Sequence, residues 1–99
     1  MNTNPLEVIK KCDEELFENI SSVRAMALKD GALPLKEKLL IAIALDAAHG
    51  ATDGVRELTK QAIGAGATKE EIMDTLRVAY FVSGVGSIYT AARALNDMF

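Results

Sequence analysis

The sequence contains no tryptophan, and aromatic residues make up only 5% of its 99 residues, although 49% are hydrophobic. A core must therefore be built from alanine, leucine, isoleucine, valine and methionine, which bury less area per residue than aromatic side chains do. Such side chains suit closely packed helices, and a chain of this length supplies one modest core. We therefore expect a single domain over residues 1–99, whose core is completed against a second copy.

Cysteine occurs once, at Cys12, which excludes an intramolecular disulfide, a CxxC redox pair and a cysteine metal cluster. Cys12 is spaced on one helical face with Ile9, Leu16 and Ile20, and we interpret it as a small buried residue rather than a reactive thiol. His49 is the only histidine, and the acids around it lack the spacing of metal ligands. We expect no metal and no cofactor.

Neither an excess of positive charge nor a long apolar run is present. Eleven basic and fourteen acidic residues give a net charge of −3 without a basic stripe, so nucleic acid is not expected as a partner. The longest apolar run, Leu39–Leu45, is far shorter than a membrane span, and charges interrupt the first fifteen residues, unlike a signal or transit peptide. We expect a cytoplasmic protein without membrane segments.

Apolar residues recur every three or four positions, and no strand-like alternation is present, so the fold class is expected to be all-α. Asn4 is expected to cap the first helix, Thr52 or Asp53 the third, and Thr68 with Glu71 forms a capping box for the fourth. We expect about five helices, at residues 4–29, 35–49, 52–64, 68–83 and 87–98.

The second of these helices is apolar on all sides between Leu39 and Leu45, so we expect it to be central and buried by its neighbours and by a second subunit. The residues expected to face inward from the other helices are Ile9, Cys12, Leu16, Ile20, Val23, Ala27, Val55, Leu58, Ala62, Ile72, Leu76, Ala79, Tyr80, Ile88, Ala91, Ala92, Leu95 and Phe99.

Two segments in this order, KEKLLIAIALDAAHG (residues 36–50) and GATKEEI (residues 66–72), are followed by a helix that ends in a glycine-rich break. This arrangement resembles the carboxymuconolactone decarboxylase family, which includes the alkylhydroperoxidase D-like proteins, over about residues 33–95. Residues 1–30 would add an N-terminal helix. The resemblance implies a small helical fold that assembles into trimers or hexamers. It also implies either lactone decarboxylation or peroxide reduction by a CxxC pair with a downstream histidine.

The resemblance also locates the family's functional positions, and here each lacks an ionisable group. The redox pair falls at Ala51 and Gly54, neither of which forms the thiolate that attacks peroxide. The expected histidine falls at Leu58, the acid early in the central helix at Leu39, and a histidine seen in the last helix of some relatives at Thr90. A dithiol peroxidase is therefore rejected.

Other residues remain as candidates. His49, Asp46 and Asp53 lie at the break between the second and third helices and are the candidates for proton transfer in a decarboxylation. The alternatives are a helix-end cap for His49 and a solvent-facing carboxylate for Asp46. Tyr80 and Tyr89 flank the glycine-rich break and are candidates to line a ligand pocket, with core or subunit packing as the alternative.

Two functions are consistent with these residues. The first is a decarboxylase-like enzyme acting on a small carboxylated lactone, or a protein that binds a small apolar or carboxylated molecule. The second is a non-catalytic oligomeric scaffold whose family active site has been lost.

Overall fold

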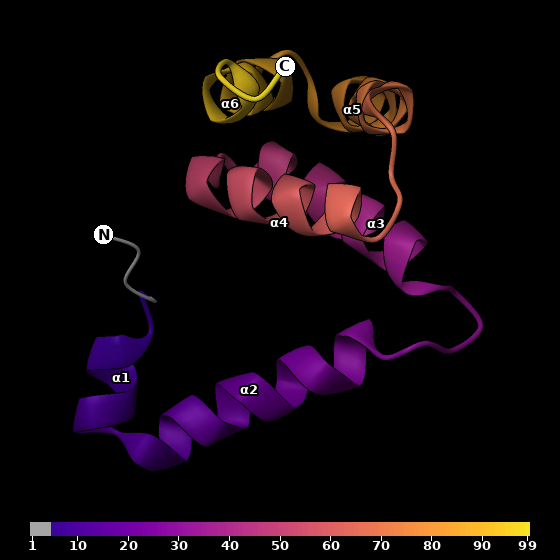
Figure 1. Ribbon diagram of the computed structural model, residues 1–99. Helices are drawn as coiled ribbons and strands as arrows, with labels where there is room; N and C mark the ends of the chain where they lie inside the picture. Colours follow the sequence, from indigo (N-terminus) through magenta and orange to yellow (C-terminus); the bar gives the residue numbers. More distant parts are fainter. Residues whose placement is uncertain (1–4) are drawn as a thin grey trace.

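The computed structural model describes residues 5–99, and within them the chain forms helices and no strand (Figure 1). The all-α class is thereby confirmed. The expected cap Asn4 lies outside the described residues. The helices are α1 (Glu7–Cys12), α2 (Glu14–Leu28), α3 (Leu35–His49), α4 (Thr52–Gly64), α5 (Lys69–Ser83) and α6 (Gly86–Leu95).

The single helix expected over residues 4–29 is wrong, because the chain leaves the helical conformation at Asp13 (φ −153°, ψ 85°). Asp13 Oδ1 accepts a hydrogen bond from the N–H of Leu16 at 3.0 Å, which makes Asp13 the N-cap of α2. Glu14 and Glu15 follow in the first turn, where the helix dipole favours negative charge. The break therefore gives six helices within the described residues.

Helices α3 to α6 form a two-layered body, with α3 and α4 in one layer and α5 and α6 in the other (Figure 1). Helix α3 packs against α4, α5 and α6, so its expected central position is confirmed. Its residues Leu39, Ile43 and Ala47 are buried. The core is completed by Val55 and Ala62 from α4, Ala67, Ile72 and Leu76 from α5 and the turn before it, and Ala91, Ala94 and Leu95 from α6.

Helices α1 and α2 stand away from this body and bury none of their residues (Figure 1). Cys12, expected to be buried, is therefore exposed, as are Leu16, Val23 and Ala27. Their spacing is correct for an apolar helix face, but nothing in this chain covers that face. Tyr80, Ala92 and Phe99 are also exposed rather than inward-facing. Tyr80, for example, follows the buried Ala79 and so points about 100° away from it around the helix.

Two ion pairs join the helices of the body. Lys36 Nζ of α3 lies 2.9 Å from Glu71 Oε2 of α5, and Glu71 also completes the predicted capping box with Thr68. Arg56 of α4 donates to both carboxylate oxygens of Asp97 at 2.6 and 3.1 Å, and to the carbonyl of Ala94 at 3.0 Å. Arg56 thus ties α4 to the C-terminal end of α6.

Over residues 5–99, none of the helices combines the length and the apolar character that crossing a membrane requires. The expected ends of three helices, at Gly50, Gly64 and Ser83, are confirmed. The expected N-cap at Thr52 or Asp53 is wrong, because α4 begins at Thr52 with Ala51 as its N-cap and no side chain caps it.

The two ion pairs make stability sensitive to acid. The hydrogen bond from Lys36 lowers the pKa of Glu71, and that from Arg56 lowers the pKa of Asp97. An unfolded carboxyl group, with a pKa of about 4, then binds a proton more readily than the folded one. The stabilisation is present above that unfolded value and is lost as the pH falls through the lower folded pKa.

We therefore expect the melting temperature to be steady from about pH 7 to pH 5 and to fall below about pH 4. Glu71→Gln keeps the capping box but removes the charge, so its melting temperature should fall less steeply in acid. The control is Glu70→Gln, because Glu70 has no ion-pair partner in the described part of the chain. Melting curves followed by circular dichroism test this, and equal acid slopes in wild type and Glu71→Gln contradict it.

Candidate functional site

The break between α3 and α4 is a sharp reversal built on Gly50, which adopts the left-handed conformation (φ 77°, ψ 18°). The N–H of Gly50 donates to the carbonyl of Ala47 at 3.3 Å, and the N–H of Ala51 to that of Asp46 at 2.9 Å. This pair of bonds is a Schellman motif, which satisfies the last carbonyls of α3 and suits glycine because it lacks a Cβ. The motif turns α4 back along α3.

The three candidates for proton transfer surround this reversal. His49 is exposed in the last turn of α3, Asp53 is exposed in the first turn of α4, and Asp46 is half-buried. No hydrogen bond or ion pair joins these three side chains to one another in the described part of the chain. They share an end of the body but form no connected acid–base system.

Asp46 instead packs against the backbone of Gly54. A Cβ atom added to Gly54 would collide with Asp46 Oδ2 and would lie 2.9 Å from Asp46 Cγ. Real Cβ atoms essentially never make such approaches, so a larger residue at position 54 requires the Asp46 carboxylate to move.

The sequence resemblance assigned functional positions to Ala51, Gly54, Leu39 and Leu58, and this assignment stays a prediction. Ala51 is the N-cap of α4 and Gly54 lies in its first turn. Leu39 is only 1% exposed within the core, and Leu58 is half-buried against it. Leu39 and Leu58 therefore serve apolar packing, and Gly54 serves the close contact between α3 and α4.

Tyr80 and Tyr89 are 52% and 63% exposed on α5 and α6. Neither lines any of the three hollows described below. Their hydroxyl groups therefore do not enter these three hollows.

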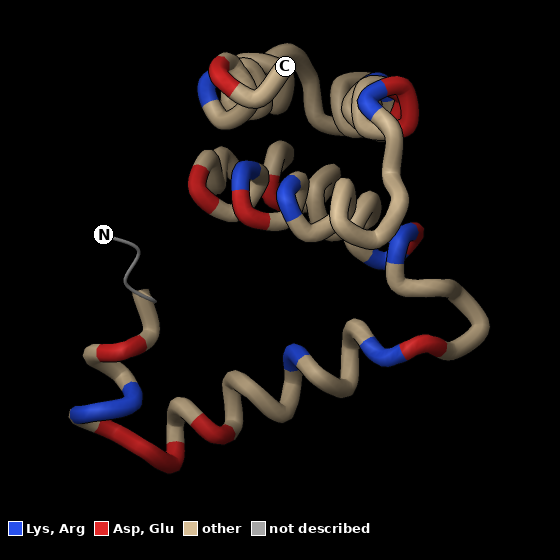
Figure 2. The backbone as a smooth tube through the Cα atoms, in the orientation of Figure 1, with Lys and Arg blue, Asp and Glu red and all other residues tan. Residues whose placement is uncertain are grey.

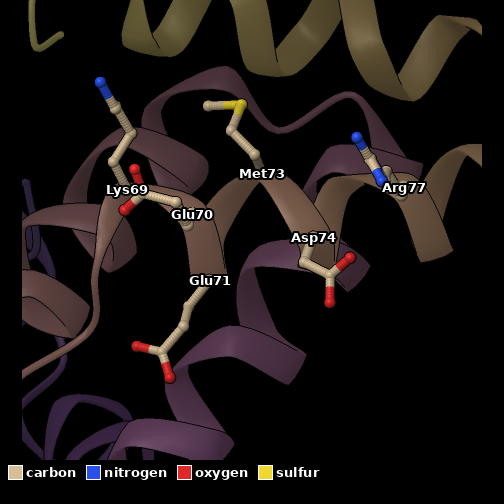
Figure 3. Close-up of a pocket in the computed structure, with 6 residues that line it drawn as sticks. All are labelled: Lys69, Glu70, Glu71, Met73, Asp74 and Arg77. Carbon is tan, nitrogen blue, oxygen red and sulfur yellow. The ribbon is translucent and has the colours of Figure 1, made fainter.

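The first hollow, of about 490 Å³, lies along the N-terminal half of α5 (Figure 3). All of its lining residues come from this one helix, so it is open to solvent. In Figure 3, Glu71 points away from Met73, toward the helix that carries its partner Lys36. Charges of both signs alternate along it, which favours neither an anion nor a cation. Its lining residues are Lys69, Glu70, Glu71, Met73, Asp74 and Arg77.

The second hollow is a groove of about 400 Å³ between α2, α3 and α4. Its lining is mostly apolar, with Arg24 and Gln61 as its polar members, and the guanidinium of Arg24 donates to Gln61 Oε1 at 2.5 Å. By its spacing Arg24 belongs to the polar, solvent-facing side of its helix, and Gln61 belongs to no motif. No local signal reveals the pair, because the two residues are 37 positions apart. The remaining lining residues are Leu28, Leu35, Leu39, Gly64 and Ala65.

The third hollow, of about 330 Å³, lies between α3 and α5 and carries no charged side chain. It is lined by Leu40, Ile41, Ala44, Leu45, Thr75 and Val78. Over residues 5–99, no three His, Cys, Asp or Glu side chains are grouped so as to hold a metal ion.

Comparison with known proteins places this geometry in a family. The sequence profile of the carboxymuconolactone decarboxylase family matches residues 14–97, which is most of the chain. The chain belongs to the carboxymuconolactone decarboxylase family. The resemblance noted from residues 36–50 and 66–72 is thereby confirmed.

Two relatives support the assignment. A crystal structure of the apo form of a carboxymuconolactone decarboxylase family protein from Legionella pneumophila superposes with a TM-score of 0.86 at 36% identity, covering 92% of this chain and 81% of that one. An uncharacterized protein from Methanocaldococcus jannaschii is 30% identical over 93 residues, which cover 94% of this chain and 87% of the relative.

The contact between Asp46 and Gly54 gives a prediction for stability. Gly54→Ala should lower the free energy of unfolding by about 1–3 kcal/mol, because its Cβ overpacks against the Asp46 carboxylate. When Asp46→Ala removes that carboxylate, the same Gly54→Ala change should become neutral or stabilising by up to about 1 kcal/mol, since alanine is the better helix former.

Urea unfolding of the four proteins in this double-mutant cycle measures the coupling between the two sites. Gly64→Ala is the matched control, because Gly64 lies at the other end of α4 with nothing within 4 Å of its added Cβ. A Gly54→Ala cost that is the same with and without Asp46 contradicts the steric explanation.

Proposed function

We propose that this carboxymuconolactone decarboxylase family member binds a small, largely apolar molecule that carries a carboxylate, in the groove between α2, α3 and α4. The observation that carries the proposal is a single guanidinium, from Arg24, at a groove whose other lining residues are apolar except for Gln61. Its volume of about 400 Å³ falls within the usual range for small-molecule sites.

Arg24 is suited to receive the carboxylate. A guanidinium binds a carboxylate through two parallel hydrogen bonds, and such charge-assisted bonds are about twice as strong as neutral ones. Arg24 now bonds to the neutral amide of Gln61 and forms no ion pair among residues 5–99. An incoming carboxylate would therefore not have to displace an acidic side chain.

Dithiol peroxidase activity is not part of the proposal. That chemistry needs two sulfurs within bonding distance. This chain has one cysteine, Cys12, which lies on the exposed end of α1, and the resemblance assigns the family's redox pair to Ala51 and Gly54, which carry no thiol.

Decarboxylation of a carboxylated lactone is the enzymatic form of the proposal. His49 would be the proton donor, and Asp46 and Asp53 would be the neighbouring acids. These groups lie at the C-terminal end of α3. The groove is lined instead by Leu35 and Leu39, in the N-terminal half of the same helix. At 1.5 Å per residue, His49 and Leu39 are about 15 Å apart along the helix, farther than one small lactone acid reaches. This separation supports binding rather than catalysis within one chain.

The alternative remains a non-catalytic oligomer that has kept the family scaffold and lost its active site. The ligand-binding experiment described next distinguishes this alternative from the binding function.

Carboxylated ligands should raise the melting temperature of the wild-type protein. The probes are benzoate, muconolactone and octanoate, with their uncharged methyl esters for comparison. A ligand at 100 times its dissociation constant adds about 2.7 kcal/mol of stability. Arg24→Met should weaken carboxylate binding by about 10- to 100-fold, because a hydrogen bond to a charged group contributes about 1.5–3 kcal/mol.

Arg93→Met is the matched control, because Arg93 is an exposed arginine of α6 outside the groove. It should bind the probes as tightly as wild type does. Equal binding by wild type and Arg24→Met contradicts the assigned site. A wild-type protein that is not stabilised by any probe supports the scaffold alternative instead.

Turnover is tested separately with carboxymuconolactone as the substrate and carbon dioxide release as the measurement. We expect His49→Ala to abolish any release seen with wild type and to leave the native molar mass unchanged. Lys60→Ala, which alters an exposed residue of α4, is the control. Full turnover in His49→Ala removes His49 from the proposed chemistry.

A further inference from the structure

The two polar side chains of the groove between α2, α3 and α4 fix each other's orientation. Arg24 and Gln61 are these side chains, and the other lining residues are leucine, glycine and alanine. The guanidinium of Arg24 donates to Gln61 Oε1 at 2.5 Å. Because a guanidinium has donors and no acceptor, the oxygen of the Gln61 amide must face it, and the amide nitrogen must face elsewhere.

The amide nitrogen of Gln61 is a free donor. Its N–H groups donate to no atom within residues 5–99, where the one hydrogen bond of this side chain is that accepted from Arg24. The guanidinium likewise makes this one hydrogen bond there, so most of its N–H groups are also free. The groove therefore presents two neighbouring sets of donors, one charged and one neutral, and its one side-chain acceptor already bonds to Arg24.

Acidic side chains of the chain itself do not neutralise these donors. After Glu18, the rest of α2 carries one charged residue, Arg24, and shows one blue segment in Figure 2. Glu57 lies one turn before Gln61 on α4, but its carboxylate is 3.6 Å from Lys60 Nζ and does not line the groove. An incoming acceptor therefore meets no competing carboxylate among the lining residues.

The apolar part of the groove lies one helical turn, about 5 Å, beyond the polar part on both helices. Leu28 follows Arg24 by four residues on the same face of α2. Ala65 follows Gln61 by four residues at the end of α4. Space remains beside this end of α4, because nothing lies within 4 Å of a Cβ atom added to Gly64. A short alkyl chain that follows a polar group fits this order.

We propose that Gln61 is a specificity-determining residue of this groove and that the preferred ligand is a 2-oxo acid with a short alkyl chain. Its carboxylate binds Arg24, its 2-oxo oxygen accepts a hydrogen bond from Gln61 Nε2, and its alkyl chain lies against Leu28 and the leucines of α3. This inference rests on the proposed carboxylate-binding function, and it adds a second recognition group to the guanidinium.

The 2-oxo group fits the donors by position and by chemistry. A hydrogen bond joins Arg24 to Gln61, so the remaining donors of the two side chains lie side by side. A 2-oxo acid carries its two acceptor groups on adjacent carbons, and neither of them donates. A 2-amino acid of the same size instead carries an ammonium, which cannot accept from Gln61 and is repelled by the guanidinium. The groove therefore discriminates between molecules of equal size.

Three acids with the same carbon skeleton test this discrimination: 4-methyl-2-oxopentanoate, 4-methylpentanoate and leucine. Isothermal titration calorimetry measures their affinity for the wild-type protein. The oxo acid should bind about 2- to 10-fold more tightly than 4-methylpentanoate, which is the contribution of one neutral hydrogen bond. Leucine should bind more weakly than both. Equal affinity for the oxo acid and 4-methylpentanoate, or tightest binding of leucine, overturns the proposal.

Two variants of Gln61 separate its roles. Gln61→Leu should keep the affinity for 4-methylpentanoate within about 2-fold and lose the preference for the oxo acid, because only the neutral donor is removed. Gln61→Glu should weaken binding of both acids by about 10-fold or more, since its carboxylate would pair with Arg24. A preference for the oxo acid that persists in Gln61→Leu, or undiminished binding by Gln61→Glu, overturns the role of Gln61.

The measured quantity is the ratio of two affinities on one protein, which partial loss of folded protein does not change. Gln61 is exposed, so both variants should retain the helical circular dichroism of wild type. The matched control is Asn19→Leu, which removes an exposed amide of α2 outside the groove. It should keep the wild-type ratio. A ratio lost equally in Asn19→Leu and Gln61→Leu overturns the assignment to Gln61.

Failure of this inference is distinguishable from failure of the proposed function. If wild type binds 4-methylpentanoate and the oxo acid with equal affinity, the carboxylate site stands and the role of Gln61 is overturned. If wild type binds neither acid, the carboxylate site and the role of Gln61 are both overturned.

Discussion

Helix α3 has no polar face between Leu39 and Leu45, and the rest of the structure depends on how this helix is covered. Helices α4, α5 and α6 exclude water from Leu39, Ile43 and Ala47. On the other side, Ile41 and Leu45 remain exposed in the single chain. Three helices do not surround the apolar middle of α3 on all sides, and the buried core contains no aromatic side chain to extend that cover. The exposed side of α3 and the exposed apolar residues of α1 and α2 have the same cause: this chain has too few helices to cover them.

The features that were predicted correctly from sequence are those determined by neighbouring residues. Gly50 ends α3 because the left-handed conformation suits glycine, and the Thr68–Glu71 capping box forms within one helical turn. The central position of α3 followed from its lack of polar side chains. Periodicity failed for residues 4–29, because a spacing typical of a buried face does not show whether the same chain covers that face. Cys12 was misplaced for this reason.

The candidate site likewise has features that the local sequence determines and features that depend on contacts between distant residues. The match of Ala51 and Gly54 to the family's redox pair stays a prediction, but their lack of thiols was evident from residue type. The groove with Arg24 was not, because Arg24 and Gln61 meet only through the packing of α2 on α4. The half-burial of Asp46 also depends on α4 returning along α3. Contacts between residues that are distant in sequence therefore decide which ionisable groups can meet a ligand, and they separate Arg24 from His49.

The packing of Asp46 against Gly54 also constrains how this chain can change over evolutionary time. A side chain at position 54 would place its Cβ against the Asp46 carboxylate, so that carboxylate must turn away, or be replaced, whenever residue 54 is substituted. Substitutions at the two positions are therefore expected to interact rather than to add. The residues tolerated at position 54 thus depend on the residue present at position 46.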